Sequence, residues 1–367
     1  MADIITEGQL AEIVWSIYEF IDNPDNPLVI DKSALVWLLF MEKIRKDQVP
    51  VSTDSNSSGH AVIQYRQNGG LKTQYWSGRQ KLLFNESEID FDLSYDFTQN
   101  HVGMEIVHQQ LKNAGFHIVP NAARSEGFAT TVSKAQRIKI QNLLTQKIAD
   151  MKDQFDIDRD HDWLVDGSAD PQDPAGLDAL LPLDPTAGIV GGRSRANPLL
   201  QHHVILNSST GAAGTLRTDL NTMVRQAMTR TRMFNGKIDF MMAGSKWLDG
   251  YTAFATANQL RTNAPASGIG KIDIGIPDTD IFFDGIPVIF NPTMDFIADE
   301  LGDDTWKRRC YGINSKTFQV GVPDGEWKEE TSPMDPADER VTRFSNDGRM
   351  SLQLNNPNGN FVNTVAA

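Results

Sequence analysis

One set of carboxylates in the chain has the spacing of a metal site: Asp156, Asp158 and Asp160. Carboxylates at alternate positions open an EF-hand calcium loop, which also needs glycine at its sixth position and a bidentate glutamate at its twelfth. Here those positions hold His161 and Gly167. The run therefore does not predict a calcium site, and we interpret its acids as a solvated turn at the end of a helix.

A second segment to test for ligand chemistry is the glycine-rich stretch Gly188-Ile189-Val190-Gly191-Gly192. A phosphate-binding P-loop ends in Gly-Lys-Ser/Thr, and a dinucleotide-binding turn has a different glycine spacing after a strand. Neither pattern is present, and Gly244-Ser245-Lys246 lacks the upstream glycine. We therefore predict that these glycines form tight turns.

Histidine and cysteine supply no catalytic pattern. The seven histidines contain no His-x-x-x-His pair and no His-Glu-x-x-His motif, which argues against a zinc site. Cys310 follows Arg308-Arg309, but no histidine is near it in the sequence, so we interpret it as a structural thiol. A single cysteine also excludes an internal disulfide. The sequence predicts a protein that is not an enzyme, with no cofactor and no metal site.

Composition and charge limit the partners. The chain has 367 residues, and 34 basic against 48 acidic residues give a net charge of -14. It contains no cluster of Lys and Arg of the kind that binds phosphates. No segment approaches the roughly 20 apolar residues that span a bilayer, and the acidic N-terminus is unlike a signal peptide. We expect synthesis in a reducing cytoplasm, no membrane contact, and at most weak, non-specific contact with nucleic acid.

The most clearly predicted element is a strand at residues 89–97. Its apolar side chains are Ile89, Phe91, Leu93, Tyr95 and Phe97, and they alternate with Glu88, Asp90, Asp92, Ser94 and Asp96. This period of two places four carboxylates on one face, whereas a helix would scatter them. Upstream, residues 62–66 and 71–76 flank Asn68-Gly69-Gly70 and predict a hairpin.

A long helix is predicted at residues 133–155, where Ser133 to Gln136 form a capping box. One apolar stripe, predicted as core, contains Ile140, Leu144, Ile148, Met151 and Phe155. The other faces carry Lys134, Arg137, Lys139, Lys147 and Lys152. This basic surface has two interpretations: it faces solvent, or it receives the acidic strand of a neighbouring subunit.

Shorter periodic segments complete the chain. Helices are predicted at 7–21, 35–44, 216–233 and 245–264, and a strand at 238–242. Hairpins are predicted around Asp284-Gly285 and around Asn346-Asp347-Gly348. Residues 166–198 are rich in proline and glycine, which is typical of a connection between two units.

Four segments, in this order, resemble the major capsid proteins of tailed bacteriophages, which have the Hong Kong 97-like fold. They are Trp163 to Ser168 with Gly176 to Leu181; Gly188 with Gly191-Gly192 and Arg193 or Arg195; Gly285-Ile286-Pro287-Val288 with Asn291-Pro292; and Tyr311-Gly312-Ile313-Asn314. The resemblance covers approximately residues 30–365. The chain departs from it at Pro198-Leu199-Leu200, where relatives often have an aromatic residue.

The resemblance implies an α+β fold with four parts: an N-terminal arm at 1–58, an extended β-hairpin loop at 59–97, a peripheral domain at 98–190 and 331–367 with a spine helix at 133–155, and an axial domain at 191–330. It implies a major capsid protein that assembles as pentamers and hexamers into the icosahedral shell around double-stranded DNA. Its location would be the virion, after assembly in the host bacterial cytoplasm. Further implied partners are a scaffold protein, a portal and a decoration protein.

The residues give a separate reason to expect assembly. A two-stranded hairpin alone in water is marginal, and large apolar side chains each gain about 1.5–3 kcal/mol when buried. If the strand at 89–97 projects from the body, a partner must cover it. We predict inter-subunit contacts at Ile89, Asp90, Phe91, Asp92, Leu93, Tyr95, Asp96, Phe97, Arg137 and Lys147, and a spine-helix core at Ile140, Leu144, Ile148 and Met151.

Three alternatives stay open at this point. An encapsulin-type nanocompartment shares the fold but encloses protein cargo, and gene neighbours would distinguish it. An α/β hydrolase that uses the acids near Asp156 would purify as a small species with metal-dependent activity. A decoration or minor head protein would differ in its stoichiometry within a particle.

Overall fold

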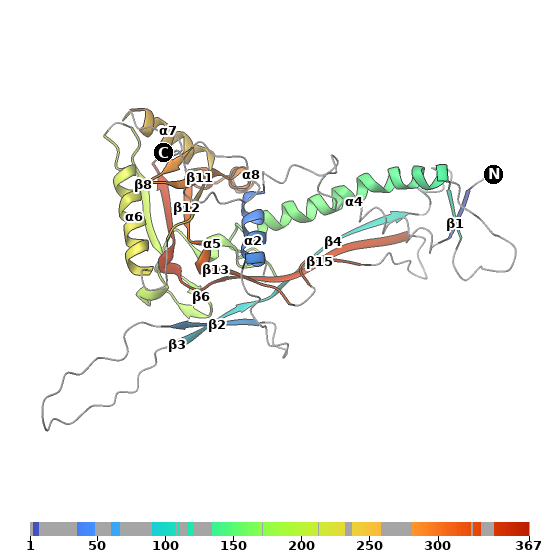
Figure 1. Ribbon diagram of the computed structural model, residues 1–367, viewed down its shortest axis with the longest axis horizontal. Coiled ribbons are helices and arrows are strands. Elements are labelled where there is room, and N and C mark those ends of the chain that lie inside the picture. The colour runs from blue at the N-terminus through green and yellow to red at the C-terminus, as the bar shows by residue number, and fades with distance from the viewer. Residues whose placement is uncertain are drawn as a thin grey trace, which may run out of the picture. The chain divides into compact units, whose positions relative to one another are not determined.

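The computed structural model describes residues 3–6, 35–47, 60–66, 90–107, 109, 116–119, 134–170, 172–211, 213–231, 237–257, 281–323, 326–331 and 341–366. The chain forms two compact units (Figure 1). The first contains Met1–Lys32, Gln99–Arg159 and Pro323–Arg349, and the second contains Ser33–Thr98, Asp160–Val322 and Met350–Ala367. The predicted arm, loop, peripheral and axial domains stay predictions.

The first unit is built on a long helix and a β-sheet. Strand β15 (Val341–Leu354) pairs with β4 (Thr98–Val107) and with β14 (Glu329–Glu330). Strands β1 (Asp3–Thr6) and β5 (Phe116–Val119) form a separate parallel pair. Helix α4 (Lys134–Asp162) supplies the predicted apolar stripe, of which Leu144, Ile148, Met151 and Phe155 are buried. The predicted helix and the burial of its apolar stripe are therefore confirmed over the described side chains, which do not include those of Ile140 and Arg137.

Helix α4 runs about two turns beyond the predicted end at residue 155, to Asp162. The interpretation of the acidic run as a solvated turn is therefore wrong, because Asp156 and Asp160 lie on the buried side of the helix. Each has a specific partner that offsets its burial. Lys328 Nζ donates to Asp156 Oδ1 at 2.7 Å within the first unit, and Asp160 is held within the second.

The second unit is built on a six-stranded sheet in the order β10-β11-β9-β12-β16-β8. The strands are β10 (Phe282–Phe283), β11 (Ile286–Phe290), β9 (Phe240–Ala243), β12 (Arg309–Ile313), β16 (Phe361–Val365) and β8 (His203–Ser208). The central strands β9 and β12 are buried at every position, as expected for strands covered on both faces. Outside this sheet, β13 (Phe318–Gly321) pairs with the last residues of β15.

Helices cover both faces of this sheet (Figure 1). On one face, α6 (Leu216–Thr231) and α7 (Ser245–Ala257) pack with Met241, Cys310 and Phe361 into one apolar cluster. On the other face, Phe40 of α2 (Val36–Asp47) contacts Phe240, with ring centroids 4.2 Å apart. Helices α5 (Leu177–Leu180) and α8 (Pro292–Leu301) also lie on that side. Helix α2, which falls within the predicted arm, is thus part of the core of the second unit.

The remaining short elements connect these layers. They are β2 (His60–Arg66), β3 (Asp90–Asp96), β6 (Ile189–Val190), β7 (Arg193–Ser194), and the 3₁₀ turns Pro198–Leu200, Trp306–Arg308, Ser315–Thr317 and Pro357–Gly359. The segment Pro198-Leu199-Leu200 is one of these turns, capped by the Asn197 side chain, and Leu200 is buried.

One of the two C-terminal hairpin predictions is confirmed and the other is wrong. Asp284 and Gly285 have φ values of 47° and 82° and close the hairpin between β10 and β11, as a type I′ turn requires. Around Gly348, in contrast, β15 continues without a turn. A Cβ on Gly348 would lie 2.7 Å from Arg159 Nη2, so this glycine permits close approach inside a strand instead of making a turn.

Other predicted elements are confirmed as far as the description reaches. Helices at 35–44, 216–233 and 245–264 correspond to α2, α6 and α7, the last described to Ala257. The strand at 238–242 corresponds to β9. The predicted helix at 7–21 and the predicted strand at 71–76 lie outside the described residues.

Candidate functional site

The strand pair β2–β3 is the first candidate site, because it contains the strand that the sequence singles out. Strand β3 confirms the predicted strand, although Ile89 lies outside the described residues. It pairs antiparallel with β2, from His60 opposite Asp96 to Arg66 opposite Asp90. Residues 62–66 thus have β3 as their described partner, and the predicted turn at Asn68-Gly69-Gly70 lies outside the described residues.

The two faces of β3 differ sharply in exposure. Asp92, Ser94 and Asp96 are exposed, whereas Leu93 is fully buried and Tyr95 is 6% exposed. Tyr95 Oη donates to the Leu354 carbonyl at 2.7 Å. The predicted alternation is therefore present. The argument that a partner must cover Leu93 and Tyr95 is wrong, however, because the same chain already covers them.

Strand β3 rests on the turn between β6 and β7. The amide of Ser94 donates to the Gly191 carbonyl at 3.1 Å, and Arg193 Nε donates to the Asp92 carbonyl at 3.4 Å. Gly191 has φ +53°, and a Cβ there would lie 2.7 Å from Leu93 Cβ and 3.1 Å from Leu93 Cα. The glycines form the tight turn predicted from the sequence. They also form the surface on which Leu93 sits, a role that sequence reasoning missed.

We expect Gly191→Ala to weaken the packing of Leu93 against the β6–β7 turn and to lower the free energy of unfolding. A left-handed residue with a Cβ costs about 1–2 kcal/mol, and the new methyl must also displace Leu93, including its main chain. Gly192→Ala is the matched control, since Gly192 also has positive φ but a Cβ there would have nothing within 4 Å. Denaturant unfolding measures the two free energies, and hydrogen exchange reports the Ser94 amide. Equal losses of unfolding free energy in both variants would show that the close contact between Gly191 and Leu93 does not matter for stability.

A buried arginine, Arg195, fixes the position of the same turn through hydrogen bonds. Arg195 is fully buried, and its Nη2 donates to the carbonyls of Ala179 and Leu180 at 2.8 Å each. Its Nη1 donates to the Leu200 carbonyl at 3.4 Å. Burial lowers the pKa of Arg195 to about 10, so it stays protonated at neutral pH. Arg195 therefore ties the β6–β7 segment to the end of α5.

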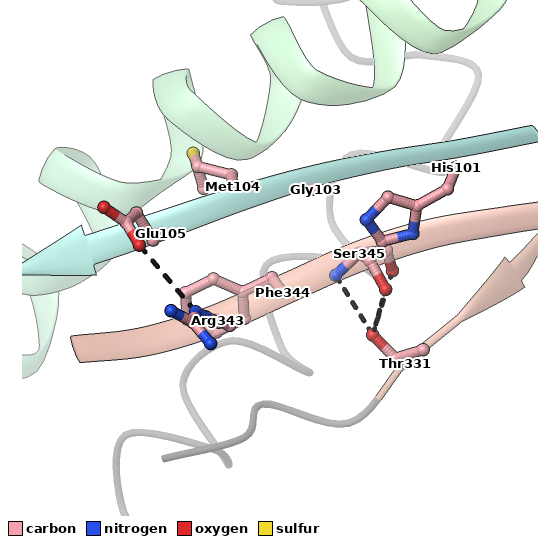
Figure 2. A pocket seen from close by; sticks show the side chains of 8 residues that line it. All are labelled: His101, Gly103, Met104, Glu105, Thr331, Arg343, Phe344 and Ser345. Atoms are coloured by element: carbon pink, nitrogen blue, oxygen red, sulfur yellow. Dashed lines mark hydrogen bonds and ion pairs between the residues drawn. The ribbon is translucent and has the colours of Figure 1, made fainter. Parts of the chain in front are cut away.

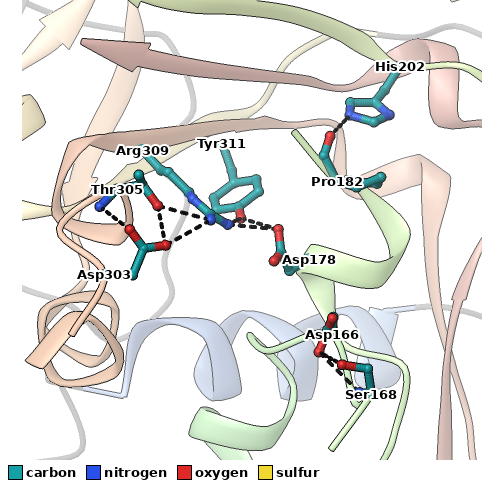
Figure 3. A network of polar contacts seen from close by, with 9 residues as sticks. All are labelled: Asp166, Ser168, Asp178, Pro182, His202, Asp303, Thr305, Arg309 and Tyr311. Atoms are coloured by element: carbon teal, nitrogen blue, oxygen red, sulfur yellow. Dashed lines mark hydrogen bonds and ion pairs between the residues drawn. The ribbon is translucent and has the colours of Figure 1, made fainter. Parts of the chain in front are cut away.

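A polar network around Arg309 is the second candidate site (Figure 3). Arg309 Nη1 donates to Asp178 Oδ1 at 2.7 Å, and Tyr311 Oη lies 3.4 Å from the same oxygen. The guanidinium also stacks on Trp306 at 4.2 Å. Burial raises the pKa values of both Asp178 and Tyr311. Because Asp178 is engaged by a cation and Tyr311 keeps its proton, the network braces β12 against α5 and presents no activated base.

The histidine near this network does not add acid–base chemistry. A ring nitrogen of His202, Nε2, lies 2.7 Å from the Pro182 carbonyl. Burial, with Arg195 nearby, lowers the pKa of His202 to about 3. The ring is therefore neutral at physiological pH, and the short contact requires its proton on Nε2 to bond the carbonyl.

A hollow in the first unit is the third candidate site (Figure 2). It has a volume of about 390 Å³ and is lined by His101, Gly103, Met104 and Glu105 of β4, by Arg343, Phe344 and Ser345 of β15, and by Thr331. Ser345 Oγ lies 2.7 Å from Thr331 Oγ1 and donates to Asp347 Oδ2 at 3.2 Å. His101 bonds Asp347, not Ser345. The serine hydroxyl therefore contacts Thr331 and Asp347, and the histidine of this hollow is bonded to Asp347 instead of activating the serine.

Metal and thiol chemistry find no support in the part of the chain that the structure describes. Within those ranges no group of three or more His, Cys, Asp or Glu side chains is placed to hold a metal ion. Cys310 is completely buried, and burial raises its thiol pKa well above the ordinary value. No described helix is long and apolar enough to cross a bilayer.

Asp160 joins three helices and predicts a pH effect. Its Oδ1 accepts from the Leu38 amide of α2 at 2.6 Å, and its Oδ2 accepts from Thr293 Oγ1 of α8 at 2.5 Å. Burial raises the pKa of Asp160 to about 6, against the opposing hydrogen bond from Thr293. The folded chain therefore binds a proton that the unfolded chain releases at lower pH, and stability falls as pH rises through 6.

We expect this carboxyl to lower the free energy of unfolding by about 1–1.5 kcal/mol between pH 5 and pH 7.5. Asp160→Asn removes that part of the pH dependence, because the amide cannot ionise. His161→Gln is the control: the neighbouring Asp162 and Glu300 raise the pKa of His161, so its charge also stabilises more at low pH. Unfolding curves at the two pH values measure the difference. An unchanged pH dependence in Asp160→Asn would exclude Asp160 as its source.

The fold of this chain is similar to that of solved phage capsid structures. The Cyanophage A-1(L) capsid asymmetric unit matches 94% of this chain and 98% of its own, with a TM-score of 0.61 and 12% sequence identity. A structure from Mycobacterium phage Bobi matches 89% of this chain and 90% of its own, with a TM-score of 0.50 and 10% identity. No protein-family model and no curated protein matches the sequence.

Proposed function

We propose that this chain, whose fold is the Hong Kong 97-like fold of tailed-phage capsid proteins, is the major capsid protein of a tailed phage. Many copies would assemble as pentamers and hexamers into an icosahedral shell around double-stranded DNA. The observation that carries the proposal is the match to a capsid subunit over nearly the whole length of both chains. The proposed place of the protein is the virion head, after assembly in the host bacterial cytoplasm.

The strand pair β2–β3 is proposed to make contacts between subunits through its exposed side. Leu93 and Tyr95 anchor β3 to its own chain, whereas Asp92 and Asp96 are exposed and Phe97 is half-buried. We propose that this acidic face, which includes Asp90, meets a neighbouring copy, and that Ile89 and Phe91 at the far end of the strand also contact that copy. The basic side of that copy's α4, including Arg137 and Lys147, is the proposed receiving surface.

The predicted domains and partners belong to the same proposal. The axial domain at 191–330 would meet its copies around the fivefold and sixfold positions, and the peripheral domain would carry the spine helix. A scaffold protein, a portal and a decoration protein are the proposed further partners. The net charge of -14 supports a shell whose inner surface does not hold the packaged DNA tightly.

Negative-stain electron microscopy of the overexpressed chain, with and without a candidate scaffold protein, tests the proposal. Closed shells, or rings of five and six subunits, are the expected products. A chain that stays monomeric at high concentration under both conditions would refute it. Particle composition then separates the shell role from that of a decoration protein, because a shell forms from this chain as its most abundant component.

A further inference from the structure

The six-stranded sheet of the second unit separates two helices with opposite surface character. Helix α6 belongs to the apolar cluster on one face, together with α7. Helix α8 lies on the other side, where Thr293 at its start bonds Asp160, the residue that also holds the start of α2. Figure 1 shows α6 and α8 on opposite sides of the strands. Their outer surfaces therefore face away from each other.

The outer face of α6 is positive. Arg217, Thr218, Thr222 and Arg225 are exposed on it, and Met228 is 44% exposed. The single acidic residue of this helix is Asp219, which is half-buried and accepts from Thr215 Oγ1 at 2.7 Å. Asp284, in the β10–β11 turn, influences the pKa of Tyr251, as Arg217 does with the opposite sign.

The outer face of α8 is acidic and apolar. This helix contains Asp295, Asp299 and Glu300 and no basic residue. The side chains of Asp299 and Glu300 are 70% and 65% exposed. Phe296 and Leu301 are the two most exposed large apolar residues on this helix, at 70% and 61%. Exposed apolar side chains rimmed by charge are typical of a protein contact surface.

Neighbouring charges occupy only part of the acidic surface. Lys307 bonds Asp299 through Oδ1, and His161 Nε2 lies 3.1 Å from Glu300 Oε2. Lys246 bonds Asp304 at 2.6 Å. One oxygen each of Asp299 and Glu300 takes part in these pairs, so the second oxygen of each can accept from an arginine of another molecule.

We infer that the outer face of α6 in one copy docks against the outer face of α8 in the next copy, with Arg217 and Arg225 facing Asp299 and Glu300. The signs of charge are complementary, and Met228 provides an apolar side chain to meet Phe296. Two different surfaces on opposite sides of one unit make a head-to-tail contact, which closes into rings when the rotation allows. The inference rests on the proposed shell function and specifies which surfaces meet.

Charge exchange tests the pairing. Arg217→Glu/Arg225→Glu and Asp299→Lys/Glu300→Lys are each expected to reduce the yield of particles at low salt at least tenfold. The four changes together are expected to restore it, because the attraction returns with its signs reversed. Lys46→Glu/Lys316→Glu changes two exposed basic residues by the same charge as the α6 double variant, and it should assemble normally.

Thermal unfolding of every variant separates assembly from folding. Wild-type yield from both double variants, or no recovery in a folded fourfold variant, would overturn the inference. If the fourfold variant does not fold, two neutral double variants test the pairing: Arg217→Gln/Arg225→Gln and Asp299→Asn/Glu300→Gln. If the pairing exists, both must give a lower yield of particles. Failure of the unaltered chain to assemble would instead count against the proposed function.

Discussion

A chain in which Asn-Gly replaces residues 67–89 is expected to fold normally and to form no shells. Arg66 and Asp90 lie directly opposite each other at the end of the β2–β3 pair, so a two-residue type I′ turn can join them without changing the strand register. The buried contacts of Leu93 and Tyr95 are kept. The replacement therefore removes the part of the predicted extended loop that lies beyond the paired strands, including Ile89, and leaves the strand pair itself intact.

Size-exclusion chromatography and electron microscopy measure the loss of assembly, and a cooperative melting curve close to that of the unaltered chain shows that folding survives. A second variant, in which Gly and Ser replace residues 67–89 at the same length, separates the loop's sequence from its reach. Normal shells from the shortened chain would mean that residues 67–89 are not needed for contacts between copies.

The largest loss of stability is expected from Trp37→Ala. The Trp37 side chain is fully buried, and its indole Nε1 donates to the Trp163 carbonyl at 3.1 Å. Its ring centroid lies 5.5 Å from that of Phe40 and 5.8 Å from that of Phe318. Truncating a buried tryptophan costs about 3–5 kcal/mol through lost contacts and the cavity that remains.

Denaturant unfolding measures this loss, and Leu39→Ala on the half-buried side of the same helix is the matched control with a smaller effect. A Trp37→Ala variant within about 1 kcal/mol of the unaltered chain, the size of an average substitution, would contradict the placement of α2 in the core. The result matters for truncation experiments. A deletion of the N-terminal residues that stops before Ser33 leaves the second unit whole, whereas one that continues to residue 58 removes part of its core.

Local patterns predicted the elements whose evidence lies within a few residues. The alternation within 89–97, the stripe from Leu144 to Phe155 and the Asp284-Gly285 turn follow from periodicity or turn chemistry. Each is present, the alternation over the described side chains of 92–96. The Asn346-Asp347-Gly348 prediction failed because Asn346 and Asp347 pair with β14 and Gly348 admits Arg159. Both are contacts with residues distant in the chain.

The candidate sites were harder to predict than the helices and strands, because they depend more on contacts between residues that are distant in the chain. Nothing near Leu93 in the sequence indicates that Gly191, about one hundred positions later, forms its seat. The burial of Asp156 and Asp160 had no such local signal: Asp156 follows Phe155 by one position and Asp160 follows it by five, so neither continues the apolar stripe at steps of three and four. Their partners Lys328, Leu38 and Thr293 are all distant in the chain, so the local pattern could not show that these two acids are buried.

At positions 92 and 94, β3 is held through its own peptide groups, the Asp92 carbonyl and the Ser94 amide, so these contacts need no particular side chain at either position. Mutation at positions 92 and 94 therefore leaves the joint unchanged, provided that position 191 carries no methyl group. Substitutions can therefore change the exposed charges of this strand, and with them the surfaces that it can contact, while the strand stays attached to its own subunit.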